Sequence, residues 1–277
     1  METQVRDLKI NPRVVRELLV RFIKEETEKV GFNKLVVGLS GGVDSALSAV
    51  LASEAIGKEN LICLILPYKS SSKDSVEDAK LLAEKFALKT ETINISPSAD
   101  ALINHDNKIE QVRKGNILAR IRMIFLYDIS AREKALVLGT SNKTELLLGY
   151  GTLFGDMAHA INPIGDLYKT QVWQLASFIG IPERIVKKKP SADLWIGQTD
   201  EDELGYTYEN IDKALYLLVD QKMKIEEVIS RGHPAKMVHD LYKRMMTSQF
   251  KRRPPIIAKV GHRTINLDFR YLRDWGS

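Results

Sequence analysis

Residues 38–45, which read GLSGGVDS, combine the residue types that can bind a chain of phosphates. Glycine at 41 and 42 lets the main chain approach an anion closely and adopt positive φ. The N–H groups of such a turn point into one concavity, and the start of a helix adds partial positive charge. Ser40 and Ser45 can donate to phosphate oxygens. Since Asp44 would repel a bare phosphate, the segment predicts a magnesium ion between the carboxylate and the phosphates.

The flanking residues place this segment between a strand and a helix. Apolar residues at 35–37 precede it, and the run at 46–51 continues it as a helix. The segment lacks the Lys-Ser/Thr pair of a Walker A loop and the GxGxxG spacing of a dinucleotide-binding turn. The alternative is a plain connection between strand and helix, with no ligand.

A second set of polar residues follows a predicted strand at 135–139. Gly139 lets the chain turn at the carboxyl end of this strand, and Thr140 is then placed to reach a nucleotide there. We expect Glu145 to share a magnesium ion with Asp44 across the site.

Two basic residues outside these loops are candidates for binding anions. Lys169 begins a predicted helix, where the helix dipole disfavours its charge, so the sequence predicts an anionic ligand nearby. Arg120 lies on a long predicted helix and can bind phosphate through two nitrogens. For each of them an exposed surface position is the alternative.

Apolar runs and helical patterns alternate through the first part of the chain. The strands at 34–39, 61–66, 90–95 and 135–139 are continuous apolar runs, typical of strands buried on both faces. This predicts an α/β fold with a doubly wound, parallel five-stranded sheet, helices on both faces and a nucleotide at the carboxyl ends of the strands. Helices near 208–219, 224–230 and 234–249 predict a C-terminal helical extension.

The length and composition fit one large domain with extensions. We expect 1–277 to be a single domain, with an N-terminal helix in 1–33, the nucleotide-binding core in 34–180 and a loop and helices in 181–277. Cys63 lies inside an apolar strand and there is no CxxC pair, which fits a reducing cytoplasm. No apolar run approaches the ~20 residues of a membrane span, and no signal peptide is visible, so a cytoplasmic protein without a membrane partner is expected.

The net charge of +5 allows an anionic partner. The dense basic runs are 187–189 and 251–253. Nucleic-acid binding usually needs a larger basic stripe with stacking aromatic residues. We therefore expect anionic nucleotide substrates and no nucleic acid.

At this point the chain resembles a known family. The loop at 38–45 resembles the Ser-Gly-Gly-X-Asp-Ser pyrophosphate loop of the ATP pyrophosphatase superfamily, which transfers AMP from ATP to an acceptor oxygen. Within that superfamily, most of the chain resembles the NAD+ synthetases. The matching blocks, in order, are 38–45, 115–123, 138–145, 166–170, 190–194, 198–205, 208–212 and 250–252.

The resemblance implies an ATP-using ligase that acts in two steps. The nicotinate carboxylate of deamido-NAD+ attacks the α-phosphate of ATP, and ammonia then displaces AMP to give NAD+. Magnesium would be held by Asp44 and Glu145, and Asp44 and Lys169 would take part in catalysis. Deamido-NAD+ would contact Arg120, Phe250 and Lys251. ATP would be held by Gly38, Leu39, Ser40, Gly41, Gly42, Val43, Asp44, Ser45, Thr140, Lys169 and Ser191.

The chain departs from the family pattern at several of these contacts. Leu153 stands where a lysine often contacts the dinucleotide, and Ala160 stands where an aspartate often does. Phe250 replaces a frequent histidine, and Ser191 replaces a frequent threonine. Residues 152–157 look more like the synthetase domain of glutamine-dependent members.

Those glutamine-dependent members carry a nitrilase-like glutaminase domain, with a nucleophilic cysteine, ahead of the synthetase. Here only residues 1–33 precede the first predicted strand. We therefore expect free ammonia as the nitrogen source, with ammonia delivered by a separate glutaminase subunit as the alternative.

Other functions stay open at the level of sequence. Another ATP pyrophosphatase could amidate or thiolate a different acceptor, although the chain lacks a CxxC pair. A module that senses ATP without catalysis would have no need of both Asp44 and Glu145. The resemblance also implies a homodimer, with the helices at 116–132 and near the C-terminus as candidate contacts.

Overall fold

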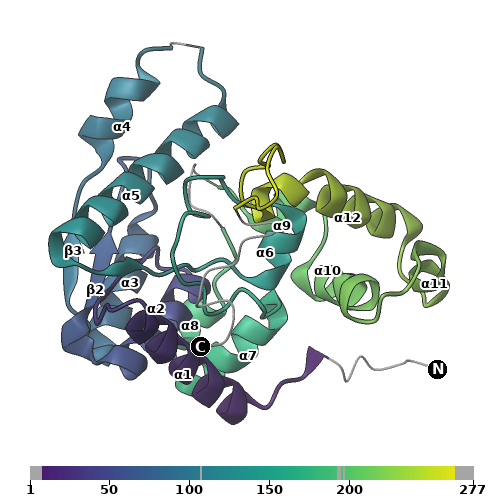
Figure 1. The fold of residues 1–277 in the computed structure, drawn as a ribbon, viewed down its shortest axis with the longest axis horizontal. Helices are drawn as coiled ribbons and strands as arrows, with labels where there is room; N and C mark the ends of the chain where they lie inside the picture. Colours follow the sequence, from purple (N-terminus) through teal and green to yellow (C-terminus); the bar gives the residue numbers. More distant parts are fainter. Residues whose placement is uncertain (1–7, 107, 192–194, 196, 266–277) are drawn as a thin grey trace.

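The computed structural model describes residues 8–106, 108–191, 195 and 197–265, and its centre is a parallel sheet (Figure 1). The order of the four described strands is β3-β2-β1-β4. Leu35 pairs with Leu61 on one side and with Leu136 on the other. The strands are β1 (Leu35–Gly38), β2 (Leu61–Ile65), β3 (Thr90–Thr92) and β4 (Leu136–Val137).

The predicted α/β class and parallel sheet are confirmed, but the expectation of five strands is wrong. Beyond β4 the chain makes one parallel bridge, between Leu138 and Ile161. The Gly139 N–H also donates to the Ile161 carbonyl at 2.7 Å. Two residues later comes Pro163, which has no N–H to continue a ladder, so a fifth strand does not form.

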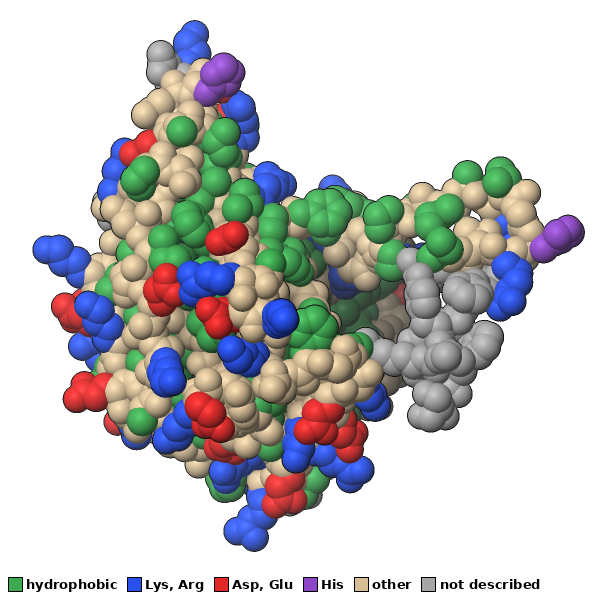
Figure 2. Space-filling model, turned by 60° about the vertical axis from the view of Figure 1, so that its left-hand side comes forward, with side chains coloured by type: hydrophobic (Ala, Val, Ile, Leu, Met, Phe, Trp, Pro, Cys, Tyr) green, Lys and Arg blue, Asp and Glu red, His purple; other side chains and the backbone are tan. Residues whose placement is uncertain are grey.

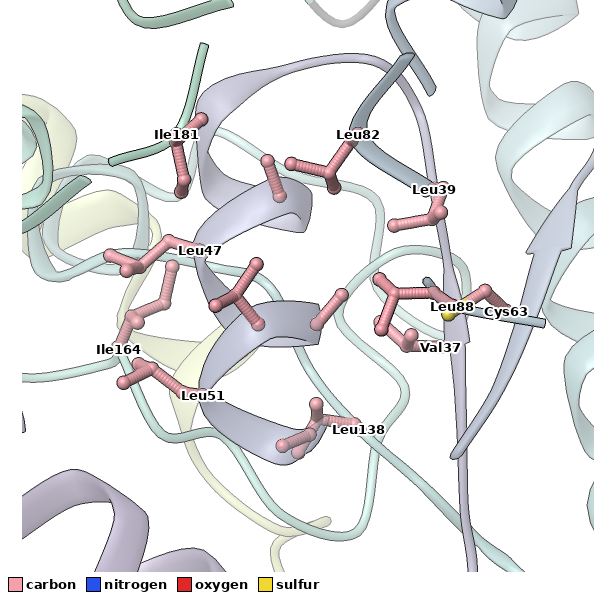
Figure 3. Packing of buried hydrophobic residues seen from close by; sticks show 14 of the residues in the cluster. Val37, Leu39, Leu47, Leu51, Cys63, Leu82, Leu88, Leu138, Ile164 and Ile181 are labelled. Atoms are coloured by element: carbon pink, nitrogen blue, oxygen red, sulfur yellow. The ribbon is translucent and has the colours of Figure 1, made fainter. Parts of the chain in front are cut away.

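Helices cover both faces of the sheet because successive strand residues point to opposite sides. Val37 lies in a core with α2 (Val43–Ile56), whereas its neighbour Val36 lies in a second core with Leu118 and Ile121. Figure 3 shows Leu47 and Leu51 of α2 among the residues of the first core. Cys63 is fully buried there, as its place in an apolar run predicts.

The other helices have the following bounds. In the α/β part they are α1 (Pro12–Lys29), α3 (Lys73–Phe86), α4 (Ser96–Ile103), α5 (Gln111–Glu133), α6 (Lys143–Leu148), α7 (Lys169–Ile179) and α8 (Glu183–Val186). Towards the C-terminus they are α9 (Asp200–Leu204), α10 (Tyr208–Leu215), α11 (Ile225–Ser230) and α12 (Ala235–Thr247). Shorter turns are η2 (Lys58–Asn60), η3 (Tyr216–Asp220) and η4 (Gln249–Arg252).

The predicted helical extension is present as an arm that α10, α11 and α12 form beside the sheet domain (Figure 1). A third buried core holds it together, with Tyr208, Leu215 and Leu241 among its members. The ring of Tyr208 meets that of Trp173 of α7 edge to face, 6.1 Å between centroids. The arm is therefore packed directly against the helix that begins with Lys169.

The strand order fixes where a ligand could sit. Helix α2 follows β1 on one face, whereas α5 leads into β4 on the other, so the chain changes face between these adjacent strands. In open α/β sheets, ligands bind outside the carboxyl ends of the strands at such a switch point. The two predicted site loops, after β1 and after β4, both begin there.

No helix in the described ranges is long and apolar enough to cross a membrane.

Candidate active site

The loop after β1 has the geometry of an anion-binding turn. Gly41 has a φ of +78°, and a Cβ at this position would lie 2.1 Å from the Ser75 carbonyl oxygen, so only glycine fits. The Ser40 and Ser45 hydroxyl oxygens lie 3.0 Å apart, and the Ser45 hydroxyl donates to the Gly42 carbonyl at 3.0 Å. The predicted phosphate donors therefore also shape the turn that would hold the phosphates.

Two carboxylates from different loops meet one ammonium group. Asp44, in the first turn of α2, is ion-paired with Lys169, which begins α7. The Lys169 Nζ also lies 3.6 Å from Glu145 Oε1. The side chain of Lys169 is 3% exposed, so this cluster is nearly closed to bulk solvent.

Asn142 orders the two carboxylates. Its side-chain Nδ2 donates to Asp44 Oδ1 at 2.9 Å, and its Oδ1 accepts from the Glu145 N–H at 3.0 Å. The Glu145 carboxylate in turn accepts from the Asn142 N–H at 3.2 Å, which completes a capping box at the start of α6. Asn142 thus links the helix that carries Glu145 to Asp44.

Burial and charge shift the protonation of this cluster. Burial and the neighbouring charge of Asp44 raise the pKa of Glu145 well above its usual value. Burial alone would lower the pKa of Lys169, but the attraction of Asp44 and Glu145 outweighs it and raises that pKa. The Lys169 ammonium group is therefore the counter-ion of Asp44, and its attraction offsets only part of the rise in the pKa of Glu145.

A second layer of polar groups lies behind Lys169. Its Nζ lies 5.3 Å from the centroid of the Tyr208 ring. The hydroxyls of Tyr208 and Tyr150 each donate to the Asp200 carboxylate at 3.0 Å. Because Asp200 is 4% exposed, burial raises its pKa, and the two hydroxyls stabilise its charged form.

The donors in this cluster fit a magnesium ion. Asp44 and Glu145 converge on a small volume that a cation, the Lys169 ammonium, shares with them. Magnesium is commonly held by one or two carboxylates, with phosphates and water as its other ligands. Across the described ranges, no group of three or more Asp, Glu, His or Cys side chains is arranged to hold a metal ion alone.

Thr140 and Ser191 are the other residues outside the phosphate loop that the sequence predicts to bind ATP. Thr140 is half-buried directly after β4 and Gly139. Ser191 is exposed, next to residues 192–194, which fall outside the described residues. The Lys188 Nζ donates to Asp78 at 2.8 Å and to Ser75 at 3.1 Å. Since the Ser75 carbonyl lies against Gly41, the segment before Ser191 is held close to the phosphate loop.

Two residues predicted to contact the dinucleotide meet at one segment. The Arg120 guanidinium donates to the Leu153 carbonyl at 3.4 Å, and the Lys251 ammonium donates to the carbonyls of Gly149 and Gly151, both at 2.8 Å. Phe250, next to Lys251 in η4, is 61% exposed. The structure therefore gives Lys251 a part in holding the turn at 149–151, which the sequence did not indicate.

Arg252 ties the end of the arm to the helix that carries Glu145. Its guanidinium donates to the carbonyls of Leu146 and Leu147, at 2.9 and 2.8 Å, where α6 ends. It also donates to the Met245 carbonyl at 2.7 Å, near the end of α12. One side chain therefore satisfies free carbonyls of two helices.

Several residues of the cluster were not singled out from the sequence. Asn142 carries a readable signal, because an Asn followed three residues later by Glu is a capping-box pattern. Asp200 and Tyr208 lie in the matching blocks at 198–205 and 208–212, but no local pattern shows that Tyr208 reaches Lys169, because that contact depends on the packing of the arm against α7.

Comparison with known proteins places the chain in a family. The model of the family described as NAD synthase matches residues 15–255. An NH3-dependent NAD+ synthetase of Trichlorobacter lovleyi is 52% identical over 269 residues, covering 97% of this chain and 98% of that protein.

Solved structures agree with this assignment. An NMN synthetase from Francisella tularensis has a TM-score of 0.80 at 34% identity, covering 91% of this chain and 100% of that one. An NH3-dependent NAD synthetase from Campylobacter jejuni, solved with a nitrate ion, has a TM-score of 0.78 at 37% identity and the same coverage. The chain therefore belongs to the NAD synthase family.

Proposed function

We propose that this protein is an NAD+ synthetase that uses ATP and ammonia to amidate deamido-NAD+. The observation that carries the proposal is the meeting of Asp44 and Glu145 at Lys169, beside the glycine turn at the carboxyl end of β1. This arrangement offers a cation site and an anion site side by side, as adenylyl transfer from ATP requires. The relatives named as NH3-dependent synthetases support the choice of substrates.

In the first step, a nicotinate carboxylate oxygen bonds to the α-phosphorus and the bond to the β-phosphate oxygen breaks, releasing pyrophosphate. We infer that residues 38–45 hold the leaving pyrophosphate with their N–H groups, while Thr140 and Ser191 contact ATP. Lys169 would give its charge to the phosphates, and Asp44 and Glu145 would hold Mg2+. When bound, the ion would neutralise charge on the phosphate oxygens.

In the second step, ammonia adds to the activated carbonyl carbon, and AMP leaves with the former carboxylate oxygen. The nitrogen then loses a proton to solvent, which leaves the neutral amide of NAD+. We infer that Arg120, Phe250 and Lys251 orient the dinucleotide. The protein needs no side-chain nucleophile for either step, because ATP itself provides the leaving group.

The test of the function is amide formation by the purified chain. With deamido-NAD+, ATP, Mg2+ and ammonium, we expect NAD+, AMP and pyrophosphate in equal amounts, measured by chromatography. With glutamine in place of ammonium, we expect no NAD+, because neither proposed step generates ammonia. NAD+ formed from glutamine alone would contradict free ammonia as the nitrogen source, and ATP left unconsumed with ammonium would contradict the function.

A smaller acceptor is the second candidate. Leu153 and Ala160 stand where the family pattern often has charged contacts to the dinucleotide, and the Francisella structure bears the name of an NMN synthetase. The same assay should therefore include the deamidated mononucleotide. A higher kcat/KM for the mononucleotide than for deamido-NAD+ would make it the preferred acceptor.

We further infer that the protein is a homodimer in the cytoplasm and that 1–277 forms one synthetase domain. Large hydrophobic side chains are exposed on α5, including Val112, Ile124 and Tyr127, and on α12, including Tyr242 and Met246. Figure 2 shows hydrophobic side chains gathered between the part of the molecule that points up in this view and the arm on the right. On the lower part of this face, acidic and basic side chains are interspersed. An exposed apolar surface of this kind is typical of a protein interface.

For a homodimer, we expect a mass near twice 31.3 kDa, measured by light scattering after gel filtration. We expect Ile124→Glu to shift the protein towards monomer, because it would bury a charge in the contact. The matched control is Val14→Glu on α1, since Val14 and Ile124 are both 54% exposed. A monomeric wild-type protein, or equal effects of both variants, would contradict this surface as the interface.

A further inference from the structure

A buried carboxylate outside the cluster joins the two helices that carry Glu145 and Lys169. Asp212 lies on α10 of the arm and is fully buried. One of its oxygens accepts from the Thr144 hydroxyl at 2.6 Å, and the other accepts from the Thr170 N–H at 2.8 Å. Thr144 and Thr170 are the direct neighbours of Glu145 and Lys169 in the sequence.

The contact with Thr144 continues to Lys169. The backbone N–H of Lys169 donates to Thr144 Oγ1 at 3.1 Å, and the same hydroxyl donates onward to Asp212. Asp212 thus accepts a hydrogen bond directly from the second N–H group of α7, that of Thr170. It is linked to the first, that of Lys169, through the Thr144 hydroxyl. These are N–H groups that a helix cannot satisfy by itself.

Tyr168, at the N-cap position of α7, does not perform this role. It makes no side-chain cap hydrogen bond, and its hydroxyl donates to Asp220. Burial raises the pKa of Asp212 to about 6, so at neutral pH it is mainly ionised and accepts both hydrogen bonds. A negative charge at the start of α7 also interacts favourably with the helix dipole.

We propose that Asp212 is a positioning residue for the reaction: through Thr144 and Thr170 it fixes Lys169 relative to Glu145. This inference rests on the proposed function of those two residues. Asp212 itself touches neither ATP nor the acceptor in the proposed mechanism. Its effect is to hold the starts of α6 and α7 in one register, so that the carboxylate and the ammonium group face the same phosphates.

The variants that test this are Asp212→Asn and Thr144→Val. An asparagine that accepts from the Thr170 N–H turns its NH2 group towards Thr144 Oγ1, so the Thr144 hydroxyl loses its acceptor and the start of α7 loses the negative charge. A valine at 144 keeps the shape of threonine but breaks the link to Lys169. Thr144→Ser retains the hydroxyl and serves as the rescue. Asp240→Asn is the matched control in the arm, because Asp240 bonds Tyr206 at 2.8 Å and Lys236 at 3.5 Å rather than the starts of α6 and α7.

The first readout is the affinity for Mg2+ with α,β-methylene ATP, which binds without reacting, measured by calorimetry. We expect Asp212→Asn and Thr144→Val to weaken this binding about 10–100-fold, as loss of a residue behind a metal ligand commonly does. Turnover should show a similar fall in kcat, with the KM for deamido-NAD+ little changed. Thr144→Ser and Asp240→Asn should bind as the wild type does.

A purely structural role would lower the melting temperature and leave the affinity and kcat of the folded variants unchanged, which would overturn the proposal. Equal losses in Thr144→Ser and Thr144→Val would overturn it too. Wild-type protein that binds Mg2+ and the analogue but forms no NAD+ would reject the proposed function, while the binding comparison would still decide the role of Asp212.

Discussion

Asp44→Asn is expected to slow pyrophosphate release from ATP severely with the fold intact. Asparagine has the same shape and can still accept from Asn142, but it carries no charge for magnesium or Lys169. We expect a loss of about 10³-fold in kcat, which corresponds to about 4 kcal/mol of transition-state stabilisation. The measurement is pyrophosphate release with deamido-NAD+ and saturating Mg2+, beside a thermal melt.

The matched control lies on the same helix. Glu54, near the other end of α2, is paired with Arg16 at 2.8 Å. Glu54→Gln removes a charge by an equally small change, about 15 Å along the helix from Asp44, and should retain full activity. If Asp44→Asn turned over at the rate of Glu54→Gln, Asp44 would not be a metal ligand.

Replacing Lys169 has the second large expected effect. Lys169→Met keeps the length of the side chain but leaves Asp44 and Glu145 facing each other without a counter-ion. Breaking a buried ion pair from one side typically costs about 3–5 kcal/mol of unfolding free energy. Because the phosphates would also lose a positive charge, we expect kcat to fall about 10²–10³-fold.

The effect of Mg2+ on the melting temperature distinguishes a change in the Asp44–Glu145–Lys169 cluster from a general loss of stability. In Lys169→Met, we expect Mg2+ alone to raise the melting temperature more than in the wild type, since no ammonium group competes for the carboxylates. Lys143→Met is the control, because Lys143 also begins a helix and meets two carboxylates, Asp220 at 2.8 Å and Asp166 at 3.1 Å. An equal response to Mg2+ in both variants would argue against a shared cation site.

The local parts of the site could be predicted because their signals are local. The glycine turn follows β1 as expected, and the apolar runs identify the parallel strands that bring Asp44 and Glu145 to one edge. The proposed ligand roles of these residues remain predictions. The charge of Lys169 at a helix start indicated an anion nearby, and the structure supplies two of them within the protein itself.

The parts that sequence missed depend on how distant elements pack. A helical period shows which face of the arm is apolar, but it does not show that Tyr208 and Asp212 lie against α7. The prediction of a fifth strand was wrong because the single bridge at Ile161 is followed by Pro163, which cannot continue a ladder. The pairing of strands is not visible in a single run of residues.

The hydrogen bonds that Arg252 makes to α6 have a consequence for how the binding of one substrate affects the binding of the other. The turn that presents Phe250 and Lys251 is joined through it to the end of the helix bearing Glu145. A dinucleotide that shifts this turn would therefore also alter the energy of nucleotide binding at the other end of that helix. By thermodynamic reciprocity, ATP would then change the affinity for the acceptor by the same factor, in addition to any effect of direct contact between the two substrates.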